Sequence, residues 1–169
     1  MLKKWKAPVR LIENIRITVR DLDGNILEQT VLKNTITNLL FNLYRDALAG
    51  DLANILDMQI KHQAIGDDDG TILPLAVTNT TLGNEVYRIP LTSDSKPAIG
   101  QYRTVFYLAP ALGVGWIREV GWYSGIASLD WGGGAGADTG TLIARVYWVR
   151  NKTALESVQF ERLDAITEA

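Results

Sequence analysis

Three consecutive aspartates, Asp67, Asp68 and Asp69, are the side chains best suited to bind a metal ion, because hard cations prefer clustered carboxylate and carbonyl oxygens. Gly70 follows them and allows a tight turn. The calcium-loop pattern, however, needs acidic residues at alternate positions and a distant glutamate, and the sequence has neither. The favoured interpretation is therefore a solvated turn, with a calcium site as the alternative, and we expect no resident metal or cofactor.

Catalytic groups are few in this sequence. His62 is the only histidine and there is no cysteine, which excludes multi-histidine metal sites and thiolate chemistry. His62 falls in phase with apolar neighbours, so we expect it to be packed inside the fold. Glycosidases use two carboxylates, and Glu85 and Glu119 are candidates for such a pair. Arg88 and Arg118 offer these glutamates simpler roles as salt-bridge partners, and we expect no enzymatic activity.

The five tryptophans are the next candidates for function, because aromatic side chains anchor subunit interfaces and bind sugars. Trp116, Trp122 and Trp148 occur in predicted strands, which favours the core or an interface. We assign these three, together with Trp5 near the N-terminus, to an interface. Trp131 lies in a glycine-rich stretch and is the predicted contact for a partner or a glycan.

Strands are the elements that must position most of these side chains. Ile15, Ile17 and Val19 alternate with polar residues, as in a half-buried strand, and Asp23-Gly24 favours a hairpin turn. Further strands are predicted at 26–32, 57–65, 82–92, 101–108, 115–124, 141–149 and 157–163, with a long loop over 124–140. Two of them, 115–124 and 141–149, are apolar in both phases, so both of their faces must be covered. We expect the helix on one face and a second sheet or another subunit on the other.

The one predicted helix covers 35–49, where apolar residues recur at helical spacing from Ile36 to Leu48. Asn34 or Thr35 is expected to cap its first turn. We expect several strands to cover the apolar side of this helix. The predicted fold is therefore mainly β (α+β): an antiparallel β-sandwich packed around one amphipathic helix.

The chain of 169 residues, 47% of them hydrophobic, is expected to form one β-rich domain over 14–169 with an extended N-terminal arm over 1–13. Lys3, Lys4 and Lys6 make this arm basic, and it is either a solvated terminus or a segment that docks on a neighbouring subunit. The net charge of −2 gives no reason to expect nucleic-acid binding. We find neither a signal-peptide pattern nor an apolar run long enough for a bilayer, so we expect cytoplasmic synthesis and no membrane insertion.

Three motifs resemble those of a known family. They read IGD…P…TNTTLGNEVYR over 65–88, IREVGWY over 117–123 and LIAR over 142–145, and a closing stretch follows at 152–162. In this order they are similar to a family of tailed-bacteriophage virion proteins that occur as tail-fibre, collar-fibre and baseplate subunits. The chain departs from the family pattern at 67–69, where glycine and threonine are usual, and at Trp122, where an aliphatic residue is commoner.

The resemblance implies a non-enzymatic structural subunit of a phage virion, acting as an adaptor in the tail, the baseplate or a fibre attachment point. Its partners would be other virion proteins and copies of itself, with a trimer preferred because fibres of this family are usually trimeric. Within the domain we expect Arg88 and Arg118 to pair with Glu85 and Glu119 and so fix strand register. The alternative is a receptor- or glycan-binding decoration or fibre module on the tail or capsid, with the loop 124–140 as its site.

Overall fold

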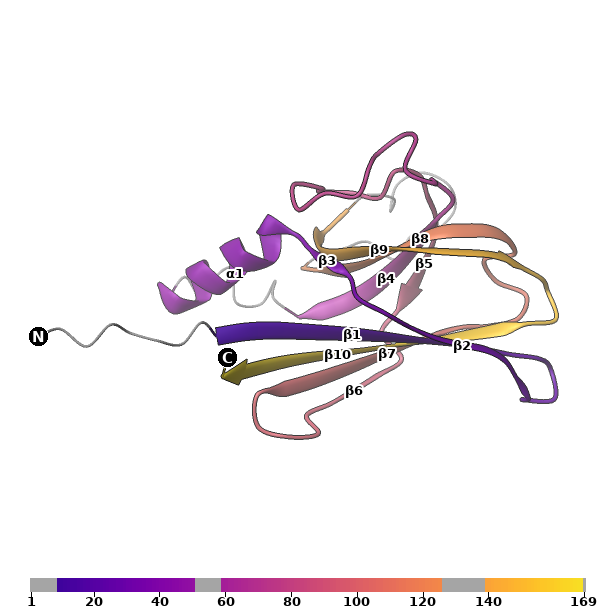
Figure 1. Cartoon of the computed structure of the whole chain (residues 1–169), viewed down its shortest axis with the longest axis horizontal. Helices are drawn as coiled ribbons and strands as arrows, with labels where there is room; N and C mark the ends of the chain where they lie inside the picture. The colour runs from indigo at the N-terminus through magenta and orange to yellow at the C-terminus, as the bar shows by residue number, and fades with distance from the viewer. Residues whose placement is uncertain (1–8, 51–58, 126–138, 169) are drawn as a thin grey trace, which may run out of the picture.

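The computed structural model describes residues 9–50, 59–125 and 139–168, and these form a β-sandwich of two antiparallel five-stranded sheets with one helix (Figure 1). Sheet A has the strand order β2 (Ile26–Leu32), β1 (Val9–Arg20), β10 (Ser157–Glu168), β7 (Gln101–Leu108) and β6 (Ser93–Ser95). Sheet B has the order β3 (Thr35–Ile36), β9 (Thr141–Lys152), β8 (Gly115–Ser124), β4 (Ile60–Gly66) and β5 (Glu85–Pro90). The predicted fold class is confirmed.

The inner faces of the two sheets form the hydrophobic core. Sheet A contributes the alternating residues predicted from the sequence, Ile15, Ile17 and Val19, all fully buried. The ring of Phe160 from β10 meets the ring of Trp148 from β9 edge to face, with centroids 5.7 Å apart. Hydrogen bonds hold the strands of each sheet together, and this side-chain packing holds the two sheets together.

The helix α1 (Asn38–Leu48) begins three residues later than predicted and is not enclosed by strands. Thr35 and Ile36 pair with β9 as the short strand β3, and Thr37, not Asn34 or Thr35, is the N-cap residue. In the helix Leu40 and Leu43 are buried. Figure 1 shows α1 at one end of the sandwich, beside the end of β10, so the core forms between the sheets and not around the helix.

The predicted arm is shorter than expected. β1 begins at Val9, whose register partner is Glu168 at the end of β10, so 9–13 belong to sheet A. This pairing within the chain satisfies backbone groups that an arm would expose to water. Residues 1–8 lie outside the described residues.

The outer face of sheet B is covered by the segment 67–84 that links β4 to β5. Leu82 from this segment packs with Ala64, Tyr123 and Leu142 in a small second apolar cluster. The Leu82 backbone N–H donates to the Tyr123 hydroxyl at 3.2 Å. Strands β8 and β9 thus have sheet A on one face, as predicted, and this segment over part of the other face, so the prediction that the helix covers that face is wrong.

Candidate functional site

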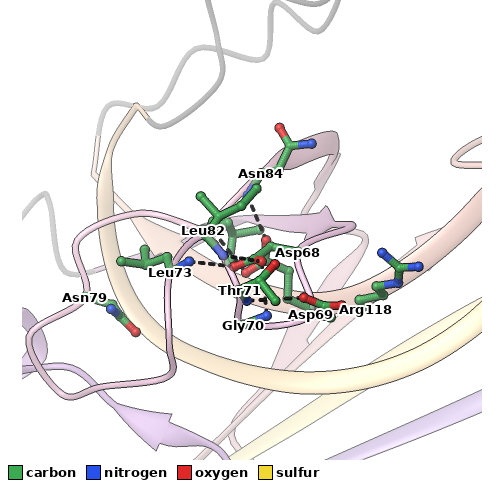
Figure 2. A network of polar contacts seen from close by, with 12 residues as sticks. Asp68, Asp69, Gly70, Thr71, Leu73, Asn79, Leu82, Asn84 and Arg118 are labelled. Atoms are coloured by element: carbon green, nitrogen blue, oxygen red, sulfur yellow. Dashed lines mark hydrogen bonds between the residues drawn. The ribbon is translucent and has the colours of Figure 1, made fainter.

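The segment 67–84, which we call the covering loop, is shaped by the carboxylate of Asp68. This carboxylate is buried and accepts backbone N–H groups from Gly70 at 3.0 Å, Ile72 at 3.0 Å and Leu73 at 2.9 Å. Figure 2 shows Asp68 pointing into the loop toward Gly70 and Leu73, while Asp69 points to Thr71. The three aspartates thus do not converge on a common point, and the predicted solvated turn is wrong for Asp68.

Arg145 on β9 lies beneath this loop and connects it to the sheet. Its guanidinium donates through Nε to Glu119 at 2.7 Å and through Nη1 to the amide oxygen of Asn79 at 3.0 Å. Nη2 reaches Glu119 at 2.6 Å and Asp68 at 3.4 Å. The side chains of Arg145, Glu119 and Asp68 are all fully buried. A single guanidinium therefore contacts two carboxylates in this buried ion network, which keeps one net negative charge.

Backbone donors stabilise this negative charge. Besides Arg145, Glu119 accepts the N–H groups of Gly83 at 3.1 Å and Asn84 at 2.9 Å. For Asp68, burial raises the pKa, but the backbone hydrogen bonds and Arg145 outweigh it, so the pKa lies below its usual value. Asp68 is thus held as a buried anion by oriented donors.

Two glycines of the sequence motifs leave room for this network. A Cβ atom on Gly83 would overlap the Asp68 carboxylate, and one on Gly66 would overlap Glu119 and a backbone carbonyl. Glycine is thus required here for space, because backbone and carboxylate approach too closely for any side chain. The motif residues at 65–88, 117–123 and 142–145 therefore meet at one place.

Of the two predicted arginine–glutamate pairs one forms, but it lies within β5 and not between adjacent strands, so it does not fix strand register as predicted. Arg88 and Glu85 form a buried bidentate pair, with Nε–Oε1 at 2.7 Å and Nη2–Oε2 at 2.6 Å. Arg118 instead donates to the backbone oxygen of Asp67 at 3.1 Å, and its predicted partner Glu119 pairs with Arg145. The reason is strand alternation: Arg145 lies opposite Gly121 on the neighbouring strand, on the same outer face as Glu119. Sequence reasoning missed Arg145 because its partner lies on another strand.

A second feature is a pocket of about 680 Å³ at the end of the sandwich beside α1. Its apolar walls include Leu40 from α1, Ile60 from β4 and Ile143 from β9. Tyr44 from α1 and Tyr102 from β7 add aromatic rings. This pocket, which we call the end pocket, has the concave and largely apolar character of binding sites. No sequence pattern indicated it, because its walls come from elements distant in the chain.

Two of the charged side chains that line the end pocket pair with each other. Arg162 and Asp164 on β10 form a bidentate ion pair, with Nε–Oδ1 at 2.9 Å and Nη2–Oδ1 at 2.8 Å. The Tyr102 hydroxyl donates to Asp94 at 3.0 Å, and burial together with this bond raises the pKa of Tyr102 to about 12. Burial and Asp164 also raise the pKa of Tyr44. Both phenols stay neutral at physiological pH and act as amphipathic wall groups.

The predicted interface tryptophans fall into three groups. Trp122 and Trp148 are wrong as interface residues, because both are buried in the core of the chain itself. Trp116 on β8 is 51% exposed, with the Arg118 guanidinium 5.4 Å from its ring centroid. Trp5 and Trp131 lie outside the described residues.

The remaining expectations concern histidine, metals and membranes. His62 is buried, as predicted. Burial lowers its pKa most, and the positive charges of Arg88 and Lys61 lower it further. In the described parts of the chain no three acidic or histidine side chains gather in a way that could hold a metal ion. Nor do these parts contain a helix long and apolar enough to cross a membrane.

No family model, no curated protein and no solved structure matches this chain.

Proposed function

We propose that the chain is a non-enzymatic structural subunit of a tailed-bacteriophage virion, an adaptor in the tail, the baseplate or a fibre attachment point. It assembles with copies of itself, preferably as a trimer, and with other virion proteins. The observation that carries this proposal is the convergence of the three family-like motifs on one buried ion network. That network fixes a loop on a sheet, which is a scaffolding role.

The state of the carboxylates supports a non-enzymatic role. Glu119 is buried against Arg145 and two backbone donors, and Glu85 is buried against Arg88. A general acid or base needs reach to a substrate and a pKa near the working pH. These two glutamates are committed to internal partners and are not free to reach a substrate.

Exposed apolar side chains support assembly. Trp116 on β8 and Val149 on β9 are both more than half exposed on neighbouring strands, and the Arg118 guanidinium lies over the Trp116 ring. Tryptophan and arginine are enriched at the centres of protein interfaces. We expect this surface to be covered in the virion.

The proposal is tested by immunogold electron microscopy on purified particles of the phage that produces the chain. Gold label at a defined place on the tail, repeated according to the tail symmetry, is the expected result. Particles that contain none of the protein would contradict the proposal.

Two binding and activity assays separate it from other functions. Zymography on cell-envelope substrates is expected to show no digestion, and digestion by the purified chain would identify a hydrolase. Binding on a glycan array that is lost in Trp131→Ala would instead favour the receptor-binding alternative.

A further inference from the structure

We propose that the end pocket receives the N-terminal segment of a second copy of this chain, residues 1–8, with the Trp5 side chain as its anchor. This inference rests on the homo-oligomeric part of the proposed function and names the contact that would join the copies.

The lining of the end pocket suits a large amphipathic aromatic group. Leu40, Ile60 and Ile143 form apolar walls, and Arg162 is already engaged by Asp164, so the pocket presents no strong net charge. An indole ring buries a large apolar area and needs one acceptor for its N–H group. The pocket also contains amide and carboxylate oxygens that can accept such a bond.

The start of β1 places the N-terminal segment at this end of the molecule. Ile166 lines the pocket and has Leu11 as its register partner, and Val9 pairs with Glu168 one step beyond. Trp5 precedes Val9 by four residues and so can lie up to about 14 Å past the end of the strand. The first described residues of β1 therefore lie next to the pocket.

Pro8 favours a contact between copies over a return into the same chain. Proline fixes its own φ near −65°, and it biases the preceding Ala7 toward extended conformations. An extended segment does not favour the sharp turn that a return into the same chain would need, so we assign it to the pocket of a neighbouring copy.

Exposed apolar side chains surround the pocket. Ile99, which lines the pocket, is fully exposed, and Leu48 near the end of α1 is 85% exposed. Exposed apolar surface of this kind beside a pocket typically marks a contact with another protein.

The test uses the full-length chain carrying Trp5→Ala, which keeps the pocket and removes the anchor. A fluorescent peptide of residues 1–8, MLKKWKAP, is titrated into this variant and followed by anisotropy. We expect saturable binding. The same peptide with alanine in place of tryptophan should bind at least tenfold more weakly.

A matched pair of surface variants, each combined with Trp5→Ala, locates the binding site. Ile99→Asp alters an exposed residue of the pocket, and Leu155→Asp alters an exposed residue in the turn between β9 and β10. Both positions are exposed, so neither change should prevent folding. We expect at least a tenfold loss of peptide affinity for Ile99→Asp and none for Leu155→Asp.

Sedimentation of the wild type and of Trp5→Ala completes the test. We expect the wild type to form an oligomer and Trp5→Ala to dissociate it. Trp5→Phe should show an intermediate degree of dissociation.

Absence of saturable peptide binding, or an equal effect of the two surface variants, would overturn the inference. A wild type that is monomeric at every concentration would overturn it too. An oligomer that persists in Trp5→Ala would refute the arm contact and leave the virion proposal intact. Particles without the protein would refute the virion proposal alone.

Discussion

Arg145 shows at the scale of one residue how the outer face of sheet B is held. Its guanidinium contacts Glu119, Asp68 and Asn79 without any exposure to water. Removing water from charges costs free energy, and here oriented partners offset that cost. The remaining carboxylates would have no cation if this side chain were lost.

Arg145→Met is therefore expected to lower the free energy of unfolding by about 3–5 kcal/mol, because it leaves two buried carboxylates uncompensated. Urea denaturation followed by circular dichroism measures the change. Arg103→Met is the control, since Arg103 pairs with Glu161 at 2.6 Å but is 41% exposed. That change should cost about 0–1 kcal/mol, and equal losses for both variants would contradict the assigned role of Arg145.

Asp68 should give the stability a specific dependence on pH. Its pKa in the folded chain lies below the ordinary value of 3.8, which applies to the unfolded chain. At a pH between the folded and the unfolded pKa, the unfolded state therefore binds more protons than the folded state. The stability from this group is fully present above the unfolded value and is lost as pH falls through the folded value. Asp68→Asn should flatten the acid limb of the stability curve measured by urea titration. An unchanged acid limb would show that Asp68 does not titrate as inferred.

At the scale of elements, the covering loop is a long connection that the sheet holds in place. Five backbone N–H groups of this loop donate to the buried carboxylates of Asp68 and Glu119. Loops usually expose such groups to water and exchange them rapidly. The ion network thus replaces the secondary structure that the loop lacks.

Hydrogen exchange tests this difference directly. The amides of Ile72, Leu73 and Asn84 should be protected to nearly the level of β8, whereas the exposed turn at 96–100 should exchange quickly. Asp68→Asn should release the amides of Ile72 and Leu73 first. Rapid exchange of these amides in the wild type would contradict the inferred role of the loop.

The strands were largely predictable because alternation is a local signal. The pattern of Ile15, Ile17 and Val19 predicted β1, and Asp23-Gly24 predicted its hairpin with β2. The start of the helix was not predictable in this way. Thr35 and Ile36 continue the helical spacing, yet they pair with Arg145 and Ala144 of β9, which lie over a hundred residues further along the chain.

The candidate site was less accessible to sequence reasoning for the same reason. Three adjacent aspartates look solvated when only local composition is considered, but a distant arginine and several backbone donors allow Asp68 to be buried. The motif glycines at 66 and 83 were the available signal, since each marks a close approach to a carboxylate. The end pocket left no such signal, because helix and strands contribute to it from separate regions of the chain.

At the scale of the whole molecule, the sandwich covers its own core and leaves several apolar side chains exposed. Trp116 and Val149 are exposed on sheet B, and Ile99 and Leu48 are exposed around the end pocket. Trp122 and Trp148, by contrast, are buried inside the single chain. The proposed assembly would therefore use outer surfaces and not the core of the sandwich.

Sedimentation velocity of the purified chain over a wide concentration series is the most direct test of this account. We predict a defined homo-oligomer, preferably a trimer, whose population rises with concentration as the exposed apolar surfaces become covered. A compact monomer at every concentration would contradict the central claim that this protein functions as an assembling structural subunit.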